Sequence, residues 1–293
     1  MHSDHRASPP RSSTFFFGTV LLTAIVLAPA DVRAQQKPKP DDFDQLLCGT
    51  ENYRNANPAD CDRFNTPQQK AVEAWYQAGQ TAMKAGQWDT AIANFTKAVE
   101  TDPNYKNADF AYYSLGQAYR AKLDFAHAIP WFDKAIQKDP SFAGSYEGRG
   151  ASLSELGNPT AALSDLDRAI SIDPKRASAY TARARIMLTR NDSESARADL
   201  DRALLLNPKD SRAYYGHAVT NSIAGKNDLA LADLTKAIEI EPNFAAAYAE
   251  RGIVYVRMKK MDEARNEFNA ALKINPADKR ARQGLDVLDG KKN

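Results

Sequence analysis

Apolar residues recur along most of the chain at spacings of three, four and seven, the pattern of helices with one apolar face. The pattern itself repeats about every 34 residues, and a proline closes each of six consecutive segments. Asp, Asn or Glu precedes each proline, which stops one helix and begins the turn into the next segment. The six prolines are Pro103, Pro140, Pro174, Pro208, Pro242 and Pro276. We therefore predict an all-α chain of helix pairs.

The same residue types return at the same places in every segment. An aromatic residue stands 28 residues before each proline and a Gly or Ala follows four residues later, while alanines flank a large apolar residue nearer the proline. Small residues let two helices approach closely, and the large residue fills the space beside them. The aromatic residues are Trp75, Tyr112, Tyr146, Tyr180, Tyr214 and Tyr248. The large apolar residues are Phe95, Phe132, Leu166, Leu200, Leu234 and Phe268.

This arrangement resembles the tetratricopeptide repeat family, in which each unit is a helix-turn-helix with tryptophan, glycine, tyrosine, alanine, phenylalanine and proline at fixed places. The resemblance implies a right-handed α-solenoid made of six units, with a C-terminal capping helix and tail over residues 277–293. We expect the array to occupy residues 67–276. Its units are expected at about 72–105, 109–142, 143–176, 177–210, 211–244 and 245–278.

Local irregularities refine the expected boundaries. Thr66 followed by Pro67 has the form of a helix start, with threonine as the cap and proline in the first turn. The second proline comes 37 residues after the first, so a longer connection is expected around Tyr105–Asp109. Pro130 falls inside an expected second helix and should bend it.

Residues 1–34 have the form of a secretory signal peptide. Arg6 and Arg11 precede an apolar run from Phe15 to Ala28, and a small-residue cleavage signal ends at Ala34. The run is shorter than the about 20 residues that a membrane-spanning helix needs, so we favour cleavage over a retained anchor. These features predict a periplasmic or secreted protein with no membrane span after cleavage.

The chain has two cysteines, Cys48 and Cys61, both in an irregular segment expected over residues 35–66. Exported proteins meet an oxidising compartment, so we predict a disulfide between them. The net charge is +2, and it falls to +1 when three basic and two acidic side chains leave with residues 1–34. This near-neutral charge argues against a nucleic acid as partner. Two histidines remain after the leader, His127 and His217, at unrelated repeat positions, so we expect no metal site.

One pair of positions changes together from unit to unit. Where the residue before the small residue of the first helix is basic, the residue before the large apolar residue of the second helix is acidic. We expect these pairs to be structural ion pairs that tie the two helices of a unit, with a ligand-binding role as the alternative. The pairs are Arg149 with Asp165, Arg183 with Asp199, His217 with Asp233, and Arg251 with Glu267.

The resemblance implies that the first helix of each unit lines a concave groove. It assigns candidate ligand contacts to inner positions of these helices, where aromatic, amide and arginine side chains suit a polypeptide. Packing against a neighbouring unit is the alternative for the aromatic residues. The candidates are Tyr76, Gln80, Tyr113, Gln117, Arg120, Arg185, Arg212 and Tyr215.

The expected function is a non-enzymatic scaffold of the cell envelope that binds another protein or a peptide segment in this groove. Outside the array there is too little chain for a catalytic domain, and no nucleophile–base set or phosphate-binding glycine loop is present, so we expect no catalytic residues and no cofactor. Binding of a glycan or lipid-linked polymer during envelope assembly or export remains an alternative, and self-association is left open.

Overall fold

The computed structural model describes residues 66–291, and every regular element in this range is an α-helix. This confirms the all-α prediction. The expected signal peptide, the residues from 35 to 65 and the Cys48–Cys61 disulfide lie outside the described residues.

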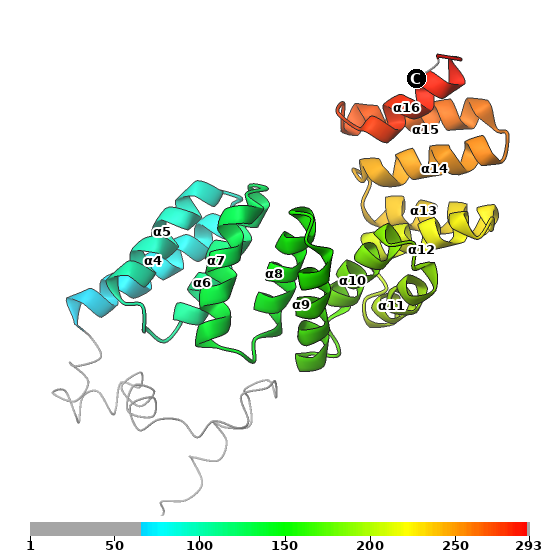
Figure 1. The fold of residues 1–293 in the computed structure, drawn as a ribbon. Helices are drawn as coiled ribbons and strands as arrows, with labels where there is room; N and C mark the ends of the chain where they lie inside the picture. Colours follow the sequence, from blue (N-terminus) through cyan, green and yellow to red (C-terminus); the bar gives the residue numbers. More distant parts are fainter. Residues whose placement is uncertain (1–65, 292–293) are drawn as a thin grey trace, which may run out of the picture. The chain divides into compact units, whose positions relative to one another are not determined.

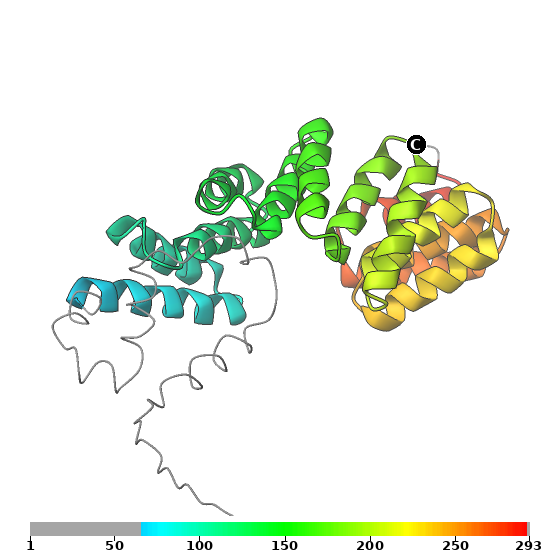
Figure 2. The same cartoon turned by 90° about the horizontal axis from the view of Figure 1, so that it is seen from below.

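Thirteen helices make up the described part of the chain, arranged as six successive pairs and one closing helix (Figure 1). We number the pairs as repeats 1 to 6, and Figure 2 follows the same order from cyan to red. The pairs are α4 (Pro67–Lys84) with α5 (Trp88–Thr101), α6 (Ala108–Ala121) with α7 (Phe125–Lys138), α8 (Ala143–Glu155) with α9 (Pro159–Ile172), α10 (Ala177–Thr189) with α11 (Ser193–Leu206), α12 (Ser211–Ile223) with α13 (Asn227–Ile240), and α14 (Ala245–Arg257) with α15 (Met261–Ile274). Helix α16 (Lys279–Leu288) follows alone.

Short polar side chains fix where the helices begin and end. Thr66 caps α4: its hydroxyl accepts from the Gln69 N–H at 3.2 Å, while Gln69 Oε1 accepts from the Thr66 N–H at 3.1 Å. At the end of α7, the Asp139 carboxylate accepts from the N–H of Ser141 at 2.8 Å, across Pro140. The same turn forms at four other repeat ends, which explains why Asp or Asn precedes proline there.

The turn inside each pair contains one residue in the left-handed region, always at the same repeat position. Glycine occupies it in three repeats, whereas Leu123, Asn191 and Lys259 adopt a φ of 60° in the others. A side chain in this conformation costs about 1 kcal/mol relative to glycine. The geometry is kept because the next N–H must reach back five residues, as Asp124 does to the Tyr119 carbonyl at 2.9 Å.

The core contains a series of large side chains, and two of them lie between glycines. Phe132 is fully buried. A Cβ on Gly116 of the same repeat would lie 2.7 Å from its ring, and one on Gly148 of the next repeat would lie 2.4 Å from it. Phe268 is enclosed in the same way by Gly252 and Gly284. Each of these two residues therefore packs within its own repeat and also against the helix that follows it.

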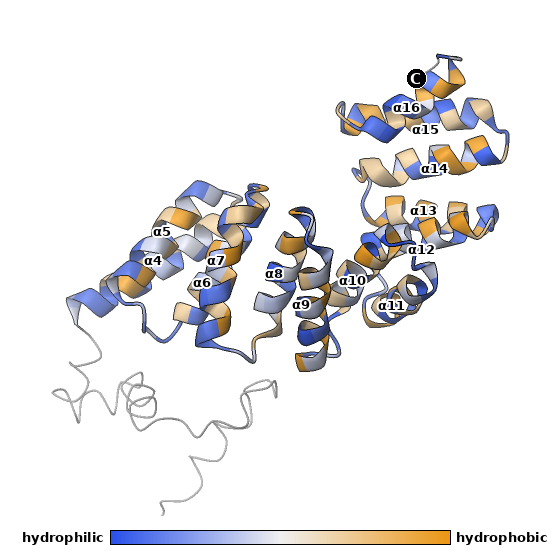
Figure 3. Ribbon diagram, viewed as in Figure 1, coloured by the Kyte–Doolittle hydropathy of each residue, from blue (hydrophilic) through white to orange (hydrophobic). Residues whose placement is uncertain are grey.

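Two irregularities predicted from the sequence are the connection between the first two repeats and the proline inside α7. The connection between α5 and α6 is longer than the other connections between repeats, as expected, and Tyr105 folds back from it onto the core. Helix α7 continues through Pro130, which is exposed, as is Ala126 four residues earlier. The Ala126 carbonyl that loses its helix partner can therefore bond to water. Each helix carries both hydrophobic and hydrophilic residues, as the sequence pattern predicts (Figure 3).

Candidate functional site: the inner face of the array

The first helices of the repeats form one continuous face. Each first helix contacts the first helix of the next repeat, from α4 with α6 to α14 with α16, whereas no two second helices contact each other. The array therefore curves with its first helices inside. We call the surface made by α4, α6, α8, α10, α12, α14 and α16 the inner face.

One inner position in each of repeats 1 to 5 is covered by the residue 29 places later in the chain. Tyr113 and Phe142 meet edge to face with ring centroids 4.9 Å apart, and Glu147 accepts from the Arg176 guanidinium at 2.8 Å. The other such pairs are Tyr76 with Tyr105, Thr181 with Asp210, and Tyr215 with Phe244. Aromatic rings contact aromatic rings, and hydrogen-bond donors contact carboxylates. The end of each of repeats 1 to 5 therefore packs over its own first helix.

Packing by the residue 29 places later determines how much of each candidate tyrosine a ligand could reach. Tyr76 is only 6% exposed, because Phe95 lies behind its ring and Tyr105 lies on it, at centroid distances of 5.8 and 6.0 Å. Tyr76 is therefore a core residue, as the packing alternative holds. Burial is the main reason that the pKa of Tyr76 is raised, and Gln80 opposes this shift. Tyr113 and Tyr215 are half-buried.

Arg120 is held on the inner face by a short chain of hydrogen bonds. Its Nη1 donates to Gln117 Oε1 at 2.7 Å, and Gln117 Nε2 donates to the Tyr113 hydroxyl at 2.6 Å. The Arg120 Nε is buried and has no partner. Burial lowers the pKa of Arg120; Glu147 opposes this shift, and the positive charge of Arg212 adds to it.

The two remaining arginine candidates are exposed and differ in their partners. Arg185 donates to Glu155 at 2.6 Å, and both side chains reach solvent, so this pair contributes little to stability. Arg212 lies at the start of α12, near enough to Arg120 for their charges to repel. Among the described residues, no carboxylate lies within ion-pair distance of Arg120 or Arg212.

At the C-terminal end the inner face is closed by Arg280 of α16. This side chain reaches back to Tyr215, whose hydroxyl accepts from it at 2.6 Å, and it lies 3.6 Å from the Glu250 carboxylate. Glu250 occupies a position that is small in repeats 2 to 5, where it is Ser114, Gly148, Ala182 and Gly216. Glu250 is 9% exposed, and burial raises its pKa. A buried carboxylate needs a cation nearby, and Arg280 supplies it.

The four expected ion pairs are brought together. Arg149 donates to both oxygens of Asp165 at 2.8 and 2.6 Å, and Arg183 does the same with Asp199 at 2.7 Å. His217 Nδ1 lies 2.9 Å from Asp233, and Arg251 lies 2.9 Å from Glu267. Asp165 and Asp199 are 7% and 6% exposed, so these contacts belong to the helix interface.

Each of these cations also contacts the preceding repeat, which the sequence comparison missed. Arg149 reaches Asp133 at 2.6 Å, Arg183 reaches Asp167 at 2.6 Å, and His217 reaches Asp201 at 3.2 Å. Arg251 finds a hydroxyl instead, on Thr235 at 3.3 Å. The acidic residue directly after the large apolar residue was the available signal. The contacts form a charged ladder that links repeats 2 to 6.

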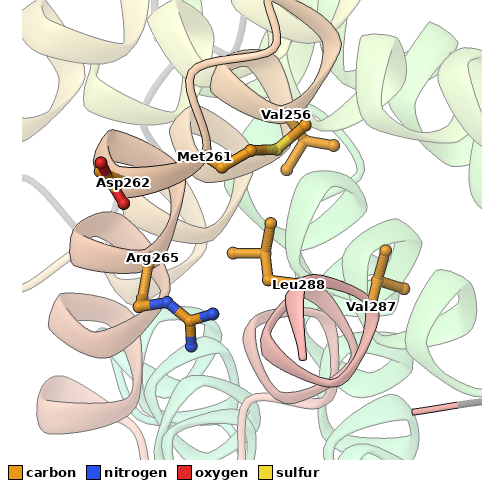
Figure 4. Close-up of a pocket in the computed structure, with 6 residues that line it drawn as sticks. All are labelled: Val256, Met261, Asp262, Arg265, Val287 and Leu288. Atoms are coloured by element: carbon orange, nitrogen blue, oxygen red, sulfur yellow. The ribbon is translucent and has the colours of Figure 1, made fainter. Parts of the chain in front are cut away.

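A pocket of about 250 Å³ lies between α14, α15 and α16 (Figure 4). It is lined by Val256, Met261, Asp262, Arg265, Val287 and Leu288. Its volume is below the range of most small-molecule sites. Within residues 66–291, no cluster of His, Cys, Asp or Glu could hold a metal ion, and no helix is long and apolar enough to cross a membrane.

A solenoid of helix pairs with a continuous inner face defines the class of protein. Models of the tetratricopeptide repeat match residues 76–142, 153–218 and 223–285, well over half of the chain. The chain belongs to the tetratricopeptide repeat family and is a scaffold for protein–protein interaction, a class that is typically non-enzymatic. No curated protein matches it.

Solved structures share this fold. PilF of Pseudomonas aeruginosa is 16% identical and aligns over 76% of this chain and 100% of its own, with a TM-score of 0.61. PilW, a widely conserved type IV pilus biogenesis factor, is 18% identical over 73% of this chain and 98% of its own, also at 0.61. The APC/C hetero-tetramer Cut9–Hcn1 is 16% identical over 85% of this chain and 46% of that one, at 0.69. At these identities the likeness establishes the fold alone.

Proposed function

We propose that this scaffold works in the cell envelope and binds a partner polypeptide on its inner face. The observation that carries the binding site is the group of polar side chains on that face: Arg185 and Arg212 are exposed, and Arg120 presents a guanidinium held by Gln117. Arginine is enriched at protein interfaces because its planar fork and long stem can contact both polar and apolar groups.

The location is supported by the sequence of the first 61 residues. A leader that ends at Ala34 would direct export, and Cys48 and Cys61 would then meet an oxidising compartment in which they can pair. Glycan binding is the second candidate. It is disfavoured because Phe142 and Phe244 already pack on the tyrosine rings that would stack on a sugar.

Site-specific photocrosslinking in cells tests the binding face. A photoreactive phenylalanine analogue is placed at Arg185 or Ser178 on the inner face, and at Lys134 or Arg202 on exposed parts of the second helices. We expect a discrete protein adduct from the inner positions only, identified by mass spectrometry. Adducts that form only from Lys134 or Arg202 would move the site to the outer face.

Cell fractionation with N-terminal sequencing tests the location. A chain that begins at Gln35 and is recovered with the periplasm or medium is the expected result. A chain that keeps its leader and fractionates with the cytosol contradicts the envelope assignment but leaves the inner-face site standing. Non-reducing mass spectrometry of the same sample reports whether Cys48 and Cys61 are joined.

A further inference from the structure

Arg120 is a partly buried cation for which residues 66–291 supply no anion within ion-pair distance. Its one hydrogen bond to a described side chain goes to Gln117, a neutral amide, and its Nε is buried without a partner. A buried donor left without a partner costs free energy, and more so when it is charged. Such a group is retained at a cost to the folded state, which is characteristic of binding sites.

The acidic residues that influence Arg120 are already engaged elsewhere. Glu147 accepts from Arg176 at 2.8 Å, and Glu155 accepts from Arg185 at 2.6 Å. Asp210, at the start of α12 beside Arg212, accepts from the Thr181 hydroxyl at 2.8 Å and from two backbone N–H groups. Neither Arg120 nor Arg212 has taken one of these carboxylates as its own.

The two arginines come from repeats 2 and 5, 92 residues apart in the chain. Both lie on first helices, and the positive charge of Arg212 acts on Arg120. Their mutual repulsion would be relieved by an anion that both guanidinium groups contact. We propose that the inner face recognises a side-chain carboxylate of the partner between Arg120 and Arg212. This inference rests on the proposed function and names the chemistry that the partner must present.

The surroundings of Arg120 add a second requirement. The hydrogen-bond chain runs from Arg120 through Gln117 to Tyr113, whose ring packs on Phe142. Phe110 also packs on Phe142, with ring centroids 5.3 Å apart. Phe110, Tyr113 and Phe142 are each partly exposed. An apolar side chain can pack on this aromatic cluster while a neighbouring carboxylate reaches Arg120. The favoured ligand is therefore an extended acidic segment with apolar residues interspersed, rather than a uniformly charged polymer.

Selection from a random 12-residue peptide display library tests this directly, because it does not require the natural partner. The baits are the wild-type protein without its leader and the variants Arg120→Gln, Arg212→Gln and Arg202→Gln. Arg202 is an exposed residue of α11 and serves as the matched control, since its change removes the same charge from a second helix.

We expect wild type and Arg202→Gln to enrich peptides that contain Asp or Glu beside apolar residues, at least twofold above their library frequency. The enrichment should disappear with Arg120→Gln and with Arg212→Gln. In anisotropy titrations, changing the selected acids to amides should weaken wild-type binding at least tenfold.

Three results would overturn the inference, and they differ in what else they affect. Selected peptides without acidic residues, or equal loss with Arg202→Gln, remove the carboxylate site but keep the scaffold. Binding of oligogalacturonate in place of any peptide points to an anionic glycan. A selection that yields no binder with the wild-type bait removes the proposed peptide-binding function as well.

Discussion

Two inner-face arginines lie beside tyrosines near opposite ends of the array, and the chain treats them differently. Arg280 donates to the Tyr215 hydroxyl and has the Glu250 carboxylate 3.6 Å away. Arg120 is linked to Tyr113 through Gln117 and has no carboxylate of its own. Burial lowers the pKa of both, but Tyr215, Glu250 and Asp278 more than offset it at Arg280, whereas the pKa of Arg120 stays below its ordinary value.

This difference separates a structural residue from a binding residue on the same face. Arg280 completes a contact that joins repeat 5, repeat 6 and α16, so partners within the folded chain already neutralise its charge. Arg120 keeps a charge that folding does not use. Their positions on the inner face do not distinguish the two arginines, because each lies on a helix of that face and close in space to a tyrosine.

Removal of Arg280 should have the largest effect on stability. The variant Arg280→Met leaves Glu250 buried without its cation, and we expect a local loss of about 2 kcal/mol, below the usual cost of breaking a buried pair because Arg280 is 42% exposed. Hydrogen exchange measures it, since long repeat arrays need not unfold in one step. Amides of α14 and α16 should lose about 30-fold in protection.

The matched control for that change is Arg282→Met. Arg282 lies on the same helix and donates only to the Pro276 carbonyl, at 2.6 Å. Protection in α14 should stay close to wild type. Equal losses in the two variants would show that Glu250 does not depend on Arg280.

His217 makes one step of the charged ladder depend on pH, because its imidazole neutralises Asp233 and Asp201 only when it is protonated. Its imidazole lies between Asp233 at 2.9 Å and Asp201 at 3.2 Å, with Asn221 beside it and Arg197 nearby. The hydrogen bond to Asp233 raises the pKa of His217 above its ordinary value. Its contribution is therefore fully present below about pH 6.5 and is lost as the pH rises through the raised pKa.

We expect repeat 5 to lose about 1 kcal/mol over this pH range. Hydrogen exchange of residues 211–242 at pH 5.5 and pH 8, corrected for intrinsic rates, should show lower protection at the higher pH. His217→Arg should remove the difference, because arginine stays charged. Equal protection of wild type at both pH values would falsify the prediction.

Removal of Arg120 should have the smallest effect. Because its charge is partly desolvated and unmatched, Arg120→Met should leave stability unchanged or raise it by up to about 1 kcal/mol. Thermal denaturation monitored by circular dichroism measures this. A clear fall in the melting temperature would mean that the chain does compensate the charge, and Arg120 would then resemble Arg280.

Much of the fold could be predicted because each repeat gives an independent observation of the same positions. The spacing of alanines, large residues and prolines placed the helix pairs, and Thr66 with Pro67 marked the first helix start. The covariation of Arg149 with Asp165 and of Arg183 with Asp199 pointed to contacts that the structure contains. Physical contacts repeated along a solenoid leave the same signature in every repeat.

The cover 29 residues after each inner position was also visible, as Tyr113 with Phe142 and Glu147 with Arg176 change together. Helix periodicity does not reveal it, because the second residue of each pair precedes the next helix and lies outside the periodic pattern. The contact of Arg280 with Tyr215 could not be found this way. It occurs once, between residues 65 apart, so no other repeat carries the pattern.

The most direct test of the difference between Arg120 and Arg280 is to give Arg120 a carboxylate from its own chain. Gln117→Glu places an anion where Gln117 Oε1 now accepts from Arg120 at 2.7 Å, without changing the size of the side chain. The measurement is the affinity of this variant, relative to wild type, for the most enriched acidic peptide. We predict binding at least tenfold weaker, because the arginine is then occupied. Unchanged affinity would contradict the account, since it would show that the partner does not use the charge that folding leaves free.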